Sequence, residues 1–174
     1  VEIHKEVTIE KHRDEFSNKM ISEKTLQIND FTLLSYENQL SLSIISNQIN
    51  DYGFYFKRFS LRNAYDVFLL SKKVKTKSVI SKFNKLKKPL NCFMANCNLV
   101  FGNLESLGYD KTNEVENYIK AFNKSLYRNK SKQKRNFKMI MINLNRKFII
   151  FCLSIVNSKS RTWLLNRIKS KLFR

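Results

Sequence analysis

Closely spaced Lys and Arg residues are the part of this sequence whose residue type and spacing could do chemistry. One basic run begins at Lys72 and another at Arg128. Like charges this close repel each other in a folded protein, whereas the phosphates of a nucleic acid backbone neutralise several at once and release counterions. The sequence therefore predicts that a nucleic acid, RNA in particular, binds at these positions: Lys72, Lys73, Lys75, Lys77, Lys82, Lys85, Lys87, Lys88, Arg128, Lys130, Lys132, Lys134, Arg135, Lys138, Arg146, Lys147, Arg161, Arg167, Lys171 and Arg174.

The charge of the chain is unevenly distributed along its 174 residues, whose formal net charge is +19. Residues 1–66 carry 8 Lys or Arg and 10 Asp or Glu, a balance of −2, while residues 67–174 carry 25 and 4, a balance of +21. This asymmetry predicts two parts. Residues 1–66 are expected to be near-neutral, β-rich and in contact with protein, and residues 67–174 to form a strongly basic α+β part that binds RNA.

Aromatic side chains beside the basic residues could add base stacking. Phe54, Tyr55, Phe56 and Phe59 surround Lys57 and Arg58, and Tyr127 and Phe137 flank the second run. Stacking of a base on an aromatic ring contributes roughly 1–3 kcal/mol. Packing in a hydrophobic core is the alternative use of such rings, and for any single one of them it is the favoured reading.

Motifs of catalysis and metal binding are missing from the sequence. It contains no GxGxxG, P-loop, HExxH or GxSxG pattern, and its two histidines both lie near the N-terminus. Cys92, Cys97 and Cys152 are odd in number and lack the spacing of a zinc site, so they are interpreted as buried free thiols of a reducing compartment. We therefore expect no enzyme activity, no metal, no cofactor and no small-molecule substrate.

The N-terminal half is predicted to contain mainly strands. Apolar and polar residues alternate over 1–9, 25–36 and 39–46, although a helix remains an alternative over 31–49. The aromatic segment 54–59 follows Gly53 and is typical of a strand. A basic helix is predicted over 77–88, where Pro89 would end it.

The C-terminal half is predicted to run strand, helix, strand, strand, helix. The apolar segment 90–101 is expected to be a buried strand, and 111–128 a helix capped by Asp110 or Thr112. A basic connector over 128–138 leads to strands 139–144 and 147–156, with a hairpin turn at Asn145 and Arg146, and a last helix spans 160–173. The fold class is therefore α+β, a small mixed sheet with helices packed on one face.

No transmembrane segment and no secretory signal are predicted. The most apolar stretch, 147–156, is shorter than the roughly 20 residues that a helix needs to cross a bilayer. Extending it upstream brings in Asn145, Arg146 and Lys147, which are costly in lipid. Residues 1–16 mix acids, bases and histidines, and the chain begins at Val1, as a processed chain or part of a longer one would.

In composition and layout the chain resembles ribosomal proteins encoded by AT-rich mitochondrial genomes, at the level of the class. It is small, strongly basic and rich in Lys, Asn, Ile and Phe, the residues that AT-rich codons specify. The resemblance implies a ribosome-bound protein of the mitochondrial matrix, with ribosomal RNA and neighbouring ribosomal proteins as partners. Two alternatives remain open: a DNA-binding or maturase-like protein, and a matrix-side accessory subunit of a respiratory membrane complex that docks on anionic lipid.

Overall fold

The computed structural model describes residues 7–8, 10–127, 132–158, 161–162 and 165–166, and divides the chain into two compact units, 1–127 and 128–174. Each unit is described by itself. Unit 1 contains η1 (Glu10–His12), α1 (Asn18–Ser22), β1 (Thr25–Ile28), β2 (Phe31–Leu34), α2 (Tyr36–Ile45), η2 (Ser46–Asn50), α3 (Gly53–Phe56), α4 (Leu61–Ser71), α5 (Thr76–Ser81), α6 (Lys87–Phe101), η3 (Glu105–Leu107) and α7 (Asn113–Tyr127). Unit 2 contains α8 (Lys132–Val156).

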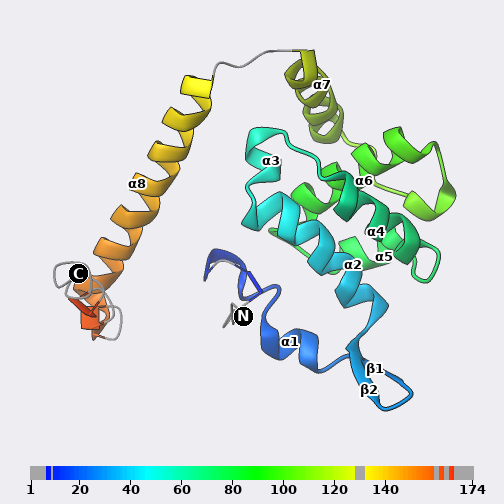
Figure 1. Ribbon diagram of the computed structural model, residues 1–174, viewed down its shortest axis with the longest axis horizontal. Helices are drawn as coiled ribbons and strands as arrows, with labels where there is room; N and C mark the ends of the chain where they lie inside the picture. Colours follow the sequence, from blue (N-terminus) through cyan, green and yellow to red (C-terminus); the bar gives the residue numbers. More distant parts are fainter. Residues whose placement is uncertain (1–6, 9, 128–131, 159–160, 163–164, 167–174) are drawn as a thin grey trace. The chain divides into compact units, whose positions relative to one another are not determined.

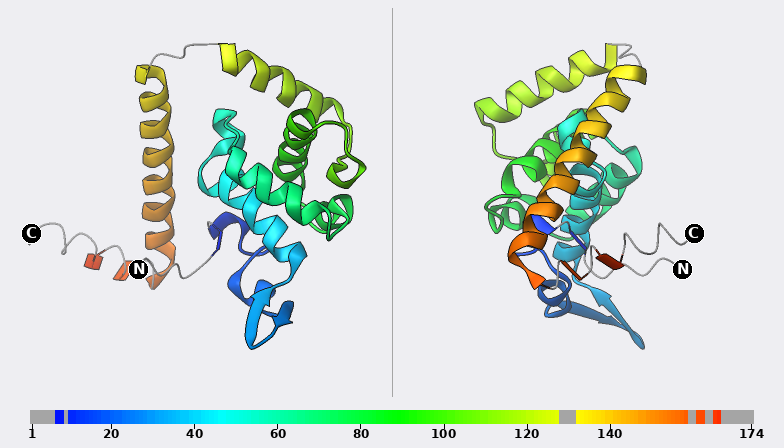
Figure 2. Two further views of the ribbon diagram at one scale, coloured as in Figure 1. Left: turned by 45° about the vertical axis from the view of Figure 1, so that its right-hand side comes forward. Right: turned by 90° about the vertical axis from the view of Figure 1, so that its left-hand side faces the viewer.

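Strands β1 and β2 confirm the strand structure predicted over 25–36, and the structure shows in addition that they pair as an antiparallel hairpin. Thr25 pairs with Leu34 and Ile28 with Phe31, so two residues, Asn29 and Asp30, make the turn. Asn29 has a φ of 53°, a left-handed conformation that Asn adopts more readily than most residues. The hairpin extends away from the helices of its unit (Figures 1 and 2), and most of its side chains are exposed.

The segment 39–46, predicted as a strand with a helix as the alternative, is helical and belongs to α2. Leu40 and Ile44 lie four residues apart on one helical face and are fully buried against Ala64 and Val67 of α4. The Ser41 hydroxyl donates a hydrogen bond to the Glu37 carbonyl oxygen at 2.9 Å, one helical turn back. The alternation of Leu, Ser and Ile therefore reflects serines whose hydroxyls are hydrogen-bonded inside the helical packing, Ser41 within α2 and Ser43 to the Asn63 carbonyl oxygen of α4.

The aromatic segment 54–59, predicted as a strand, instead begins with the single helical turn α3. Tyr52 and Lys57 on either side of this turn both have a φ of 55°, so the chain reverses at each end. Gly53 permits the close approach that results, because a Cβ atom there would lie 2.5 Å from the Asn47 carbonyl oxygen. A short turn held between two left-handed residues has no periodicity that a sequence pattern could detect.

Helix α6 replaces the strand predicted over 90–101. Residues 89–97 are all buried, because α6 lies among α2, α4, α5 and α7. A continuous apolar run fits a buried helix as well as a buried strand, and only the surroundings decide between them. Pro89, expected to end the preceding helix, is instead the third residue of α6, in the first turn, where no intrahelical N–H bond is lost.

The helix predicted over 77–88 is interrupted, since α5 ends at Ser81 and α6 starts at Lys87. The carboxylate of Glu15 accepts hydrogen bonds from the backbone N–H groups of Asn84, Lys85 and Leu86, at 3.2, 2.5 and 3.0 Å. Glu15 is about 70 residues away in the chain, so this interruption depends on a contact that the local sequence does not encode.

Helix α7 confirms the prediction over 111–128. Val115, Tyr118 and Phe122 are buried against Cys92 and Ala95 of α6. The N–H of Val115 donates to the Thr112 hydroxyl at 3.3 Å, which identifies the cap as Thr112. Strong amphipathic spacing and a recognisable cap made this element predictable.

Helix α8 corrects the predicted hairpin of 139–144 and 147–156. The chain runs as one helix from Lys132 through the expected turn at Asn145 and Arg146, and the expected connector 128–138 enters it at Lys132. The segment contains neither Gly nor Pro, so it has no residue that breaks a helix, and the pair Asn145–Arg146 lacks the Gly that a two-residue hairpin turn favours. The strands predicted in residues 1–9 and the helix predicted over 160–173 fall mostly outside the described residues.

The segment Met139–Val156 of α8 is long and apolar enough, by length and composition, to cross a membrane. Its mean hydropathy is 1.7 over 18 residues. The sequence prediction divided this region into two short strands, and neither strand alone is long enough to cross a membrane. The length of the apolar segment becomes evident only when the region is seen to be one helix. The absence of a membrane span stays a prediction.

At a coarse level the structure is consistent with the α+β class, but helices dominate it and the sheet has two strands in the described residues. The strand-helix-strand-strand-helix order predicted for the C-terminal half is wrong at α6 and α8, as given above. The change of charge between residues 66 and 67 falls within α4.

Candidate nucleic-acid interface

The first part of the lysine run lies on the turn between α4 and α5. Lys72 follows the last residue of α4, Lys75 precedes α5, and Lys77 is in the first turn of α5. The buried Thr76 hydroxyl lies 3.0 Å from the carbonyl oxygens of both Ser106 and Gly108. These contacts attach the turn to the segment around η3, so the backbone that presents the lysines is held in place.

The four side chains Lys72, Lys73, Lys75 and Lys77, here called the turn lysines, are exposed. Among the described residues, none of them forms an ion pair with an acid. The ammonium group of Lys72 lies 4.5 Å from the centre of the Phe68 ring, and the Lys77 stem lies beside Gly108. The turn lysines thus carry positive charge that no acidic side chain of the described structure offsets.

The second part of the run is paired with acids. Lys82 contacts Glu37 at 2.5 Å, Lys87 contacts Asp110 at 3.4 Å, Lys88 contacts Glu114 at 2.7 Å, and Lys85 contacts Asp14. Each pair is about half exposed, so solvent screens its attraction and it adds little to stability. Lys82, Lys85, Lys87 and Lys88, the paired lysines, therefore present less net charge to a polyanion than their sequence suggests.

The electrostatic effect of this pairing appears in the carboxyl groups. A hydrogen bond from Lys82 lowers the pKa of Glu37, and one from Lys85 lowers the pKa of Asp14. The acids come from α2, the segment between η1 and α1, the loop before α7 and the first turn of α7, far from the lysines in sequence. Sequence reasoning missed these partners, because no local spacing signals a pair separated by 45 residues.

The second basic run belongs to unit 2. Lys132, Lys134, Arg135 and Lys138 lie in the first two turns of α8, and Arg146 and Lys147 lie near its middle. Arg161 is held by α8 itself, since its guanidinium donates to the carbonyl oxygens of Ser154 and Ile155 at 3.2 and 2.9 Å. Other predicted positions fall outside the described residues: Arg128, Lys130, Arg167, Lys171 and Arg174.

Several aromatic rings proposed for base stacking are packed within unit 1. Phe54 stacks on Tyr118 with 5.3 Å between ring centroids, and the Lys57 ammonium lies over both rings. Phe59 contacts the rings of Phe93 and Phe122. These rings pack within unit 1 and are not available to stack on bases. The turn lysines are therefore suited to contact the phosphate backbone of a nucleic acid, with few aromatic rings beside them for stacking.

Two of the three cysteines are buried and all three are free thiols. Burial raises the pKa of the Cys92 thiol to about 11 and also raises the pKa of Cys97. Cys152, on α8, is exposed, unlike the expectation for all three. No group of three His, Cys, Asp or Glu side chains suited to a metal ion occurs within the described ranges.

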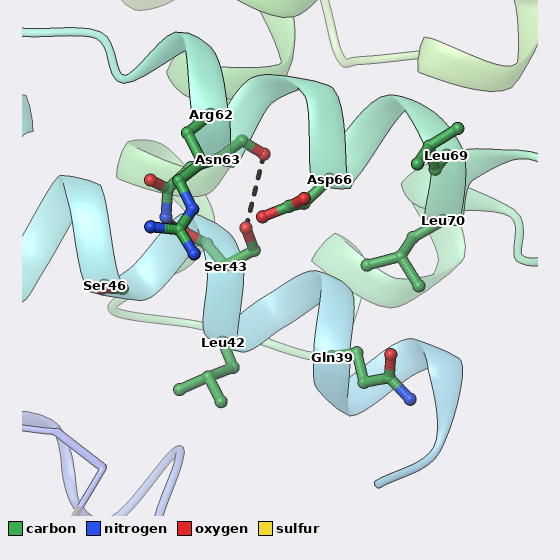
Figure 3. Close-up of a pocket in the computed structure, with 9 residues that line it drawn as sticks. All are labelled: Gln39, Leu42, Ser43, Ser46, Arg62, Asn63, Asp66, Leu69 and Leu70. Carbon is green, nitrogen blue, oxygen red and sulfur yellow. Dashed lines mark hydrogen bonds between the residues drawn. The ribbon is translucent and has the colours of Figure 1, made fainter. Parts of the chain in front are cut away.

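An open hollow of about 620 Å³ lies between α2 and α4 (Figure 3). The Ser43 hydroxyl donates to the Asn63 carbonyl oxygen at 3.3 Å, and the Asn63 amide donates back to the Ser43 carbonyl oxygen at 2.8 Å. Asp66 and Arg62 are the charged groups of its lining, which contains neither His nor Cys. The polar groups here join two helices, and the hollow offers no paired nucleophile and base.

Comparisons of the chain with protein-family models, with curated proteins and with solved structures find no match.

Proposed function

We propose that the protein is a structural, non-catalytic component of an organellar ribosome that binds ribosomal RNA and so supports translation. The observation that carries the proposal is the exposed set of turn lysines, which lack acidic partners in the described structure and are mounted on a fixed turn. The location proposed with it is the mitochondrial matrix, and what supports this location is the abundance of residues that AT-rich codons specify.

The mechanism is electrostatic. Lys ammonium groups act as point charges that suit phosphate oxygens, whereas reading of base edges depends mainly on Arg, Asn and Gln. The α4–α5 turn brings four such groups close together on a backbone that Thr76 already holds. Neighbouring phosphates along an RNA strand would neutralise this cluster and release its counterions.

The β1–β2 hairpin supports the proposed protein contacts of residues 1–66. Phe31 is 71% exposed, and Ile28 and Leu33 on the same hairpin are also exposed. Exposed apolar side chains on an extended hairpin suit burial by a neighbouring protein better than contact with phosphate.

The decisive experiment compares two variants with equal loss of charge. One changes the turn lysines, Lys72, Lys73, Lys75 and Lys77, to Gln, and the control changes the paired lysines, Lys82, Lys85, Lys87 and Lys88, to Gln. Binding of a structured ribosomal RNA fragment is measured against salt concentration. The turn variant should lower the magnitude of the slope of log affinity against log salt by about 3, since each lost phosphate contact removes roughly 0.7–0.9.

The control variant should retain most of the slope, because its lysines are already paired with acids. Equal losses in both variants would show that binding follows total charge and would count against the turn as a site. Changing Lys130, Lys132, Lys134 and Arg135 together to Glu should also abolish RNA association, which tests the second run.

Competition with duplex DNA of the same sequence separates the proposal from a DNA-binding role. RNA should be preferred in the presence of excess DNA, and the native protein should sediment with ribosomal particles at moderate salt. A protein that prefers duplex DNA, or that sediments free of ribosomes, would contradict the proposed function.

A further inference from the structure

Helix α8 presents an exposed apolar stripe along one side. Its large residues recur at spacings of three and four, as one face of a helix with about 3.6 residues per turn requires. They are between 51% and 65% exposed: Ile140, Met141, Leu144, Phe148, Phe151 and Ile155. An apolar surface of this length needs a covering partner, because soluble proteins rarely leave so large a patch in water.

Cations accompany the stripe on α8. The helix contains Lys132, Lys134, Arg135, Lys138, Arg146 and Lys147, and the sequence from Asn117 to the C-terminus contains no acid. Four of the six cations precede the stripe, Arg146 falls on the side of the helix away from Leu144, and Lys147, three residues after Leu144 and four before Phe151, flanks the stripe itself. The partner must therefore be apolar where the stripe contacts it and anionic beside it.

These two requirements distinguish the candidate partners. An RNA backbone offers anionic phosphate but no apolar surface for the stripe. A bilayer with anionic lipids offers both, since acyl chains lie directly below charged headgroups. A spanning orientation would place Arg146 and Lys147 in the middle of the 18-residue apolar segment, at the depth where charge is most costly.

We propose that α8 is an amphipathic membrane-surface helix, which lies in the headgroup region of an anionic bilayer with its stripe toward the acyl chains. This role goes beyond RNA binding: the turn lysines belong to the other unit, whereas the cations at the start of α8 are shared with the second basic run proposed for RNA. A chain with both properties would hold its RNA at a membrane surface.

Flotation of the full-length protein with vesicles tests the proposal. Vesicles of phosphatidylcholine mixed with phosphatidylglycerol should carry the protein upward, and vesicles of pure phosphatidylcholine should carry much less. The variant L144Q/F151Q, which interrupts the stripe, should partition at least about tenfold more weakly into the anionic vesicles. The matched control I149Q/V156Q changes two exposed apolar residues of α8 that lie off the stripe and should partition nearly as the wild type does.

Four outcomes would overturn the proposal. Equal loss in both variants, with binding that resists high salt and alkali, would indicate a spanning helix. Undiminished flotation of L144Q/F151Q would show that the cations alone hold the protein on lipid. Absence of vesicle binding, with a change of oligomeric state in L144Q/F151Q, would show that a second copy covers the stripe. Loss of RNA binding in L144Q/F151Q, together with no vesicle binding by the wild type, would show that α8 contacts RNA and not lipid. If that variant loses vesicle binding but still binds RNA, the two roles are separate.

Discussion

Helices α6 and α8 are both rich in apolar residues, both lie in regions where the sequence predicted strands, and yet they differ in what covers them. Residues 89–97 of α6 are buried within unit 1, among α2, α4, α5 and α7. On α8, large apolar residues from Ile140 to Ile155 are more than half exposed. The same kind of composition thus serves a core in one region and a surface in the other, and burial rather than hydropathy separates the two roles.

Truncation of one phenylalanine in each helix should give the largest contrast. Phe93→Ala removes a fully buried ring from the centre of unit 1 and should lower the free energy of unfolding by about 3–5 kcal/mol. Phe148→Ala, on the exposed stripe, should change it by no more than about 0.5 kcal/mol. Urea denaturation followed by circular dichroism measures both, and a comparable loss in Phe148→Ala would mean that the stripe of α8 is covered within the folded chain.

The rates at which the cysteines are alkylated should also differ between α6 and α8, and this is the second largest of the expected effects. Cys92 and Cys97 lie in α6, where burial raises both pKa values and leaves little thiolate at neutral pH, while Cys152 on α8 is exposed. Iodoacetamide should therefore modify Cys152 at least about a hundredfold faster, as peptide mass spectrometry would show. Raising the pH toward 11 should accelerate Cys92, and rapid labelling of Cys92 at neutral pH would contradict its burial.

The smallest effect should come from the ion pairs at the surface of unit 1. The hydrogen bond from Lys82 lowers the pKa of Glu37 in the folded state, so this contribution is present above the unfolded value of about 4.5 and is lost as the pH falls through the folded value. Because the pair is exposed, Glu37→Gln should change the free energy of unfolding at neutral pH by less than about 1 kcal/mol.

Thermal unfolding of the wild type and Glu37→Gln from neutral to acidic pH measures that difference. The two curves should converge below the folded pKa of Glu37. A large and constant gap between them would show that Glu37 contributes through packing, and would weaken the view that the α6 core, not the surface pairs, holds unit 1 together.

The elements that could be predicted are those whose signals are local. Helix α7 has amphipathic spacing and a Thr112 cap, and the β1–β2 hairpin has alternation with Asn at its turn. Helices α6 and α8 were predicted as strands, because apolar residues are so dense in both segments that the sequence pattern fits a buried strand as well as a helix. The break between α5 and α6 depends on Glu15, which only the tertiary fold brings to that turn.

The sequence predicted that the candidate site is basic, but it did not predict which of its lysines are paired with acids. The lysines from Lys72 to Lys88 look alike in sequence, and their different roles arise from four acids that folding places beside the second group. Lys85 and Asp14, for example, are 71 residues apart. Such pairing depends on how α2, α6 and the loops around them pack, and no spacing within the run reports it.

The attachment of the α4–α5 turn through Thr76 also bears on the kinetics of recognition. With its main chain already ordered, the turn gives up only side-chain rotamer entropy when an anion arrives, so encounter and capture can occur in one step. The same rigidity fixes the spacing of the four lysine Cα atoms, while the flexible lysine stems let the ammonium groups adjust to phosphates spaced differently along a strand.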